Sequence, residues 1–100
     1  MKNKHYENLW VESENFYLKS NEEEDIEDIT NKLHLKISLY KSLSGNNSFS
    51  KEEKISVLNH TFGEILFELC KISAKDNINV YSSLQNILNH KIVDKFEIKK

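Results

Sequence analysis

The segment Leu58–Lys75, LNHTFGEILFELCKISAK, is the most strongly apolar helical stretch of the chain. Its apolar side chains recur every three or four residues, which places them along one side of an α-helix: Ile55, Leu58, Phe62, Ile65, Leu69 and Ile72. Leu66, Phe67 and Cys70 widen this stripe, so we expect the helix to pack against more than one neighbour. Gly63 lies in its middle, where glycine costs about 1 kcal/mol relative to alanine. We therefore expect a close helix crossing at Gly63.

Four helices are predicted, this segment included, because the chain has no proline and only two glycines. They span about residues 4–18, 22–43, 51–75 and 80–96. The expected N-caps are Asn21, Ser50 and Asn79, and Ser50 begins a capping box with Glu53. The fourth helix is expected to turn its apolar side chains inward, namely Val80, Leu84, Ile87, Leu88, Ile92 and Phe96. Short loops between the last three helices favour one all-α domain over residues 1–100, a four-helix antiparallel bundle.

The composition is that of an ordinary globular protein, with 100 residues, 38% hydrophobic and 30% charged. The formal net charge of −2 creates no overall field that attracts nucleic acid. No apolar run approaches the roughly 20 residues that span a bilayer, and the N-terminus lacks a signal peptide, so we expect a cytoplasmic protein without a membrane partner. Several helices have apolar residues on more than one side, which predicts a homo-oligomer. The single cysteine, Cys70, is interpreted as a buried, unreactive thiol.

An acidic cluster is the first candidate site. If the second and third helices pair symmetrically about residues 46 and 47, Asp25 faces Glu68 and Asp28 falls near Glu64. Each pair of acids shares a helix face because its members are three or four residues apart. Four converging carboxylates make a hard oxygen site that suits Mg²⁺ or Mn²⁺. The alternative is that the segment 22–28 is a solvated helix start and that the two glutamates only face water.

Aromatic and basic side chains are a second candidate. Trp10 on the first helix can stack on a nucleobase, and Lys71 on the third can contact a phosphate, which predicts a nucleotide-binding surface. All 14 basic residues are lysines, so a phosphate contact must come from lysine, backbone or metal. The alternatives are core or oligomer packing for the tryptophan and a solubilising face for the lysine.

The segment Phe62–Leu69, FGEILFEL, followed by Ile72–Lys75, resembles the third helix of MazG-like nucleoside triphosphate pyrophosphohydrolases. That family has a Gly-Asp-Leu-Leu-Phe run on this helix. The likeness continues through Ile78-Asn79, which resembles the Ile-Asp helix start of the family. It then includes Ser83, Leu84, Lys91 and Phe96, so that it covers roughly residues 58–96.

The resemblance implies an all-α, usually oligomeric fold and Mg²⁺-dependent cleavage of a nucleoside triphosphate to a monophosphate and pyrophosphate. It also implies metal ligands from an ExxE pair on one helix and an ExxD pair on the next. The family's Asp matches Glu64, but its Glu three residues earlier falls on Thr61. The ExxE pair is expected around residues 31–37, where this chain has Lys32 and Lys36.

Two hypotheses about function follow. The first is an active or relic MazG-like pyrophosphohydrolase whose metal ligands are Glu64 and Glu68 with Asp25 or Asp28. The second is a non-catalytic helical oligomer that uses the same scaffold to bind a nucleotide or a protein partner. An unrelated small bundle that acts only as an interaction module is a third interpretation.

Overall fold

The computed structural model describes residues 2–20 and 23–98, which form four helices and no strand. The bounds of these helices are α1 Lys2–Lys19, α2 Ile26–Ser44, α3 Lys51–Asp76 and α4 Val80–Ile98. The all-α prediction is therefore confirmed for the described part of the chain. None of these helices is both long and apolar enough to cross a membrane.

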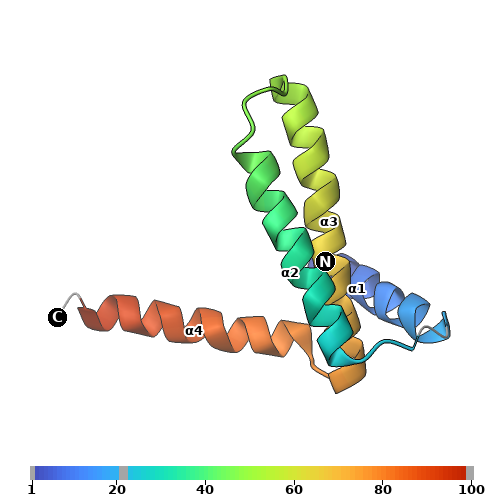
Figure 1. Ribbon diagram of the computed structural model, residues 1–100. Helices are drawn as coiled ribbons and strands as arrows, with labels where there is room; N and C mark the ends of the chain where they lie inside the picture. The colour runs from blue at the N-terminus through green and yellow to red at the C-terminus, as the bar shows by residue number, and fades with distance from the viewer. Residues whose placement is uncertain (1, 21–22, 99–100) are drawn as a thin grey trace.

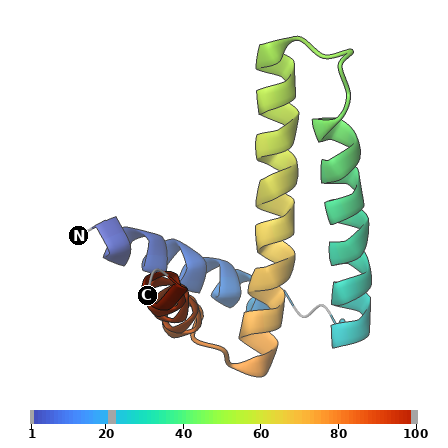
Figure 2. The same cartoon turned by 90° about the vertical axis from the view of Figure 1, so that its left-hand side faces the viewer.

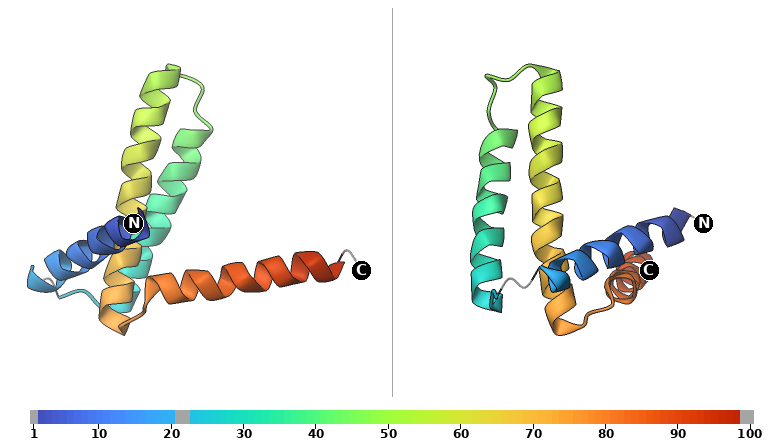
Figure 3. Two further views of the ribbon diagram at one scale, coloured as in Figure 1. Left: turned by 180° about the vertical axis from the view of Figure 1, so that it is seen from behind. Right: turned by 90° about the vertical axis from the view of Figure 1, so that its right-hand side faces the viewer.

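Helix α3 is the longest element and separates two sides of the molecule (Figure 1). On one side, α2 packs against it as an antiparallel hairpin. On the other side, α1 crosses α3 near its C-terminal half, and α4 leaves from the C-terminal end of α3 (Figure 2). Helix α4 then runs away from the hairpin, so that the C-terminal end of the described chain lies far from α2 (Figure 3). Three helices thus form the packed part of the bundle.

Local capping determines where the helices begin. Ser50 caps α3 as predicted, because its side chain accepts a hydrogen bond from the Glu53 amide while the Glu53 carboxylate accepts one from the Ser50 amide. Asn79 caps α4 by accepting a 2.9 Å hydrogen bond from the amide of Ser82. At its other end α3 terminates at Asn77, which adopts the left-handed conformation with φ 55° that asparagine tolerates well.

Helix α2 begins four residues later than predicted. Its N-cap is Asp25, whereas Asn21 lies outside the described residues. Asp25 accepts a 2.8 Å hydrogen bond from the amide of Asp28, and the Asp28 carboxylate accepts one from the Asp25 amide. This capping box fixes Asp25 in an extended conformation, so residues 23–25 precede the helix.

The core of the described chain is small and unusually polar. Its buried apolar side chains are Tyr17, Ile29 and Cys70. Four polar or charged residues on α3 are buried as well, namely Thr61, Glu68, Lys71 and Ser73. Because buried charges are normally paired, Glu68 and Lys71 identify where electrostatic interactions contribute to the packing of the helices.

The interior face predicted for α4 is exposed in this chain. Leu84, Ile87, Leu88 and Ile92 are 65%, 53%, 50% and 45% exposed, and the side chain of Phe96 lies outside the described ones. The inward orientation was therefore wrong for the single chain, because α4 runs away from α1–α3. The helix crossing expected at Gly63 is also wrong within one chain, since a Cβ built there meets no atom within 4 Å.

Candidate functional site

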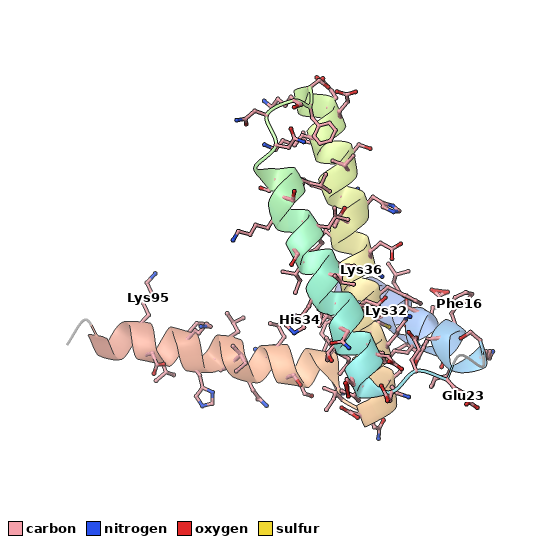
Figure 4. The ribbon with its side chains drawn as sticks, viewed as in Figure 1. Phe16, Glu23, Lys32, His34, Lys36 and Lys95 are labelled. Atoms are coloured by element: carbon pink, nitrogen blue, oxygen red, sulfur yellow. The ribbon has the colours of Figure 1, made fainter. Side chains whose placement is uncertain are left out.

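Glu68 is the centre of the charged region between α2 and α3. Its carboxylate is 2% exposed, and its Oε2 accepts a 2.6 Å hydrogen bond from the ammonium of Lys36 on α2. The same ammonium donates to Glu64 Oε1 at 2.9 Å. Glu64 and Glu68 are one helical turn apart on α3, so a single lysine from the facing helix reaches both. Figure 4 shows Lys36 on α2, next to α3.

A second ammonium, that of the buried Lys71, lies on the other side of Glu68. Lys71 Nζ is 3.3 Å from Glu68 Oε1 and donates a 3.0 Å hydrogen bond to Glu24 Oε1. It also lies 5.6 Å from the ring centroids of both Tyr17 and Phe67. Carboxylates and aromatic faces therefore surround this cation, and both stabilise a desolvated positive charge.

Glu24 completes the arrangement from the extended segment before α2. Besides Lys71 it accepts a hydrogen bond from Lys32 on the second turn of α2. We call the whole set the lysine–carboxylate cluster, which consists of Lys32, Lys36, Lys71, Glu24, Glu64 and Glu68. Its three ammonium groups balance its three carboxylates, so the cluster has no net charge when all six are ionised.

Hydrogen bonds in the cluster favour the charged forms of Glu24, Lys36 and Glu64. The hydrogen bond from Lys36 lowers the pKa of Glu64 below 4.5, and the hydrogen bond from Lys32 lowers the pKa of Glu24 in the same way. Burial acts to lower the pKa of Lys36, but its hydrogen bonds to Glu68 and Glu64 outweigh that effect and raise the pKa above 10.5. Every one of these shifts favours the ionised cluster at neutral pH.

The predicted metal ligands do not form one group. Asp25 and Asp28 bond to each other in the capping box of α2, whereas Glu64 and Glu68 bond to Lys36. Among residues 2–20 and 23–98, no three or more His, Cys, Asp or Glu side chains are arranged to hold a metal ion. The groups around Glu68 are two ammonium ions and the carboxylates that they bind. A site that contains two cations does not fit Mg²⁺ or Mn²⁺.

The helical register explains this difference. Symmetric pairing places residue 29 opposite Glu64, but the structure places Lys36 there. The pair of rings from Tyr40 and Phe62, with centroids 6.3 Å apart, shows the same axial offset. The connection 45–50 runs along the first turns of α3, so α3 begins beyond the end of α2 (Figure 1). The assumption of a symmetric hairpin was therefore wrong.

The two predicted nucleotide contacts bond within the chain. Trp10 Nε1 donates a 3.0 Å hydrogen bond to Ser73 Oγ, and Ser73 Oγ lies 2.6 Å from Glu14 Oε2. Lys71 is 5% exposed and bonds to the carboxylates described above.

Sequence reasoning missed Lys36, Lys32 and Glu24 as members of the cluster. The available signal was the spacing of four residues between the two lysines of α2, which matches the spacing of Glu64 and Glu68 on α3.

An apolar groove occupies the opposite side of α3. It has a volume of about 420 Å³ and lies between α1, α3 and the first turns of α4. Leu9 and Trp10 of α1, Gly63, Leu66 and Phe67 of α3, and Val80 and Leu84 of α4 are among the residues that line it. The residues that line this groove include no charged side chain, in contrast to the cluster on the α2 side.

Comparisons with protein-family models, curated proteins and solved structures find no match to this chain. The MazG-like resemblance therefore stays a prediction.

Proposed function

We propose that this chain is a non-catalytic helical protein on a MazG-like scaffold, which acts by associating with a protein partner rather than by hydrolysing a nucleotide. The observation that carries the proposal is the position of Lys36. Its ammonium lies within 2.9 Å of both Glu64, which the resemblance aligns with a metal ligand of the family, and Glu68, which the predicted acidic cluster adds. A cation that belongs to the chain thus compensates the carboxylates that Mg²⁺ would bind.

The charge of the cluster supports the same conclusion. A metal that serves a triphosphate needs an excess of negative ligands, because it must neutralise charge that develops on the phosphates. Here each carboxylate is matched by an ammonium, and Lys36 and Lys71 are both held by carboxylates. Lys71, the predicted contact to a nucleotide phosphate, is thus already bonded to carboxylates of its own chain. This favours a protein partner over a nucleotide.

The test is a measurement of pyrophosphate release from a panel of nucleoside triphosphates with Mg²⁺ and with Mn²⁺. We expect no release and no metal-dependent rise in melting temperature. Release that Glu64→Gln abolishes would overturn the proposal in favour of an active pyrophosphohydrolase. A nucleotide that raises the melting temperature without turnover would shift the proposed ligand from protein to nucleotide.

A matched pair of variants makes the role of Lys36 measurable. Lys36→Ala removes the ammonium that neutralises Glu64 and Glu68, so this variant should gain stabilisation by Mn²⁺ that the wild type lacks. Lys41→Ala, an exposed lysine on the same helix, should behave like the wild type. Equal Mn²⁺ stabilisation of all three proteins would show that Lys36 does not control access of the metal.

A further inference from the structure

The single chain exposes far more surface than a folded protein of its mass. A compact protein of 11.8 kDa has an accessible surface of about 5,900 Å², whereas this chain has 8,290 Å². Its radius of gyration is 16.7 Å, compared with about 13 Å for a compact domain of 100 residues. The excess is roughly 2,400 Å², which indicates that a large surface is covered by something else.

Helix α4 accounts for much of this excess. Leu84, Ile87, Leu88 and Ile92 recur at steps of three and four residues, so they form one stripe along the helix. All four are at least 45% exposed. A helix gains most of its stability from packing an apolar face rather than from its intrinsic propensity. Helix α4 therefore requires a partner against which this stripe packs.

The apolar groove is continuous with that stripe. A second part of the groove, lined by Leu69, Ile72, Ile78 and Ile87, leads from α3 directly onto the exposed face of α4. Helices α1 and α4 lie on the same side of α3 and diverge from it (Figures 2 and 3). Residues of all three helices line the groove. One chain thus has both an exposed apolar stripe on α4 and an apolar groove beside it.

Gly63 lies on the wall of this groove. A side chain there would meet no atom of its own chain within 4 Å, so the packing of the single chain does not account for the glycine. In the middle of a helix, glycine costs about 1 kcal/mol relative to alanine. A helix from outside the chain that approaches closely at this position accounts for the missing side chain.

We propose that the groove receives α4 of a second copy of this chain, in a two-fold pair in which each copy inserts its own α4 and receives the other. The inference rests on the proposed function, because it identifies the protein partner as the chain itself. A two-fold pair uses the same surface on both copies, so the stripe and the groove of each chain are covered together. The absence of charged side chains from the groove lining keeps the desolvation cost low.

The area is consistent with this occupant. If both copies bury their excess, the pair covers roughly 4,800 Å² in total, within the range of about 2,000–5,000 Å² found for obligate homodimers. A standard-size complex buries about 800 Å² on each partner, and a transient one buries less, which would leave most of the excess exposed. A second copy is therefore the occupant that the surface favours.

The first experiment measures the mass of the full chain in solution by sedimentation equilibrium over a wide concentration range. We expect two copies of the 11.8 kDa chain, and a monomer at all concentrations would overturn the proposal. Leu88→Glu places a charge in the stripe and should weaken the pair at least tenfold. Asn86→Glu adds the same charge on the opposite side of α4 and should leave the association unchanged. Equal weakening by both variants would contradict a contact through the stripe.

A second variant tests the groove without altering α4. The Cβ of Gly63→Leu meets no atom of the single chain within 4 Å, so the α1–α3 packing should persist, as circular dichroism would show. It should nevertheless weaken the pair at least tenfold by blocking the close approach of the second helix. Association of Gly63→Leu as tight as that of the wild type would show that the groove is not the docking site.

Mixing the two variants distinguishes a helix in a groove from other two-fold contacts. Leu88→Glu keeps an intact groove, and Gly63→Leu keeps an intact α4, so the mixture can form one complete contact. We expect the mixture to associate more tightly than either variant alone. A mixture no tighter than its components would exclude the insertion of α4 into the groove of the other copy.

Trp10 provides an independent spectroscopic readout, because it is the only tryptophan and it lines the groove. Its emission should shift to shorter wavelength as the wild-type concentration rises and should not shift in Leu88→Glu. Unchanged emission while the mass doubles would place the interface elsewhere. A monomer that releases no pyrophosphate would contradict this inference alone, whereas metal-dependent hydrolysis by a dimer would contradict only the proposed lack of catalysis.

Discussion

The two sides of α3 differ in whether the chain itself pairs or covers the side chains on them. On the α2 side, the lysine–carboxylate cluster pairs six ionised groups with one another inside one chain. On the α1 and α4 side, the groove and the stripe of α4 present large apolar side chains to solvent. Charged groups that are already paired have little to offer a ligand, while exposed apolar surface gains free energy when it is covered. The contrast supports the proposal that association occurs on the apolar side.

Among substitutions that test this comparison, Glu68→Ala should lower the unfolding free energy most. The substitution leaves the buried ammonium of Lys71 with Glu24 alone and removes one partner of Lys36, and breaking a buried ion pair in this way costs about 3–5 kcal/mol. Urea unfolding at a fixed protein concentration measures the loss. The double variant Glu68→Leu with Lys71→Met should lose much less, because it removes both charges together. A single variant as stable as the wild type would show that the cluster is only a surface feature.

Trp10→Phe should have a smaller effect, about 1 kcal/mol, because it removes the hydrogen bond from the indole to Ser73 while it keeps an aromatic ring at the groove. A double-mutant cycle with Ser73→Ala isolates that bond in the unfolding free energy. If the two losses add fully, the hydrogen bond does not contribute to the packing of α1 on α3.

Gly63→Ala tests the comparison because its effect on the unfolding free energy should depend on whether a second copy occupies the groove. In the Leu88→Glu background, where α4 does not dock, the added methyl group has free space and should raise the unfolding free energy by about 1 kcal/mol through helix propensity. In the wild-type background the gain should be smaller or reversed, because the methyl group meets the second copy. Equal gains in both backgrounds would contradict a close approach at Gly63.

The smallest effect is expected in the pH dependence of stability. The pKa of Glu64 is lowered in the folded state, so its contribution is present above pH 4.5 and is lost as the pH falls through the folded value. The pKa of Lys36 is raised, so its contribution is present below pH 10.5 and is lost as the pH rises above that value. Lys36→Ala should reduce both dependences, whereas Lys41→Ala should reduce neither. Thermal unfolding at a series of pH values provides the comparison.

Local signals in the sequence were sufficient for most of the helix boundaries. Ser50 with Glu53, Asn79 and Asn77 each act on the residues next to them, so their roles follow from a few neighbouring letters. The N-cap of α2 was assigned to Asn21 rather than to Asp25, because several consecutive residues there are possible caps. The capping box with Asp28 decides between them, and only the geometry shows which pair forms.

Long-range contacts could not be predicted from neighbouring residues in this way. The pairing of Lys36 with Glu64 and Glu68 depends on how far α3 extends beyond α2, and the connection 45–50 permits several offsets. The direction of α4 depends on the short turn after Asn77, so an apolar stripe predicted to face inward faces solvent in one chain. Periodicity identified the apolar face correctly but not the surface that covers it.

Cys70 has a consequence for measuring motion in this molecule. Its Sγ lies 3.7 Å from the backbone oxygen of Trp10, and burial followed by the nearby charge of Glu14 raises the pKa of the thiol to about 11. Because Cys70 is only 1% exposed, a thiol reagent reaches it only when the packing around it opens. The rate of labelling should report the opening equilibrium of that contact separately from unfolding of the α2–α3 hairpin, without any introduced probe.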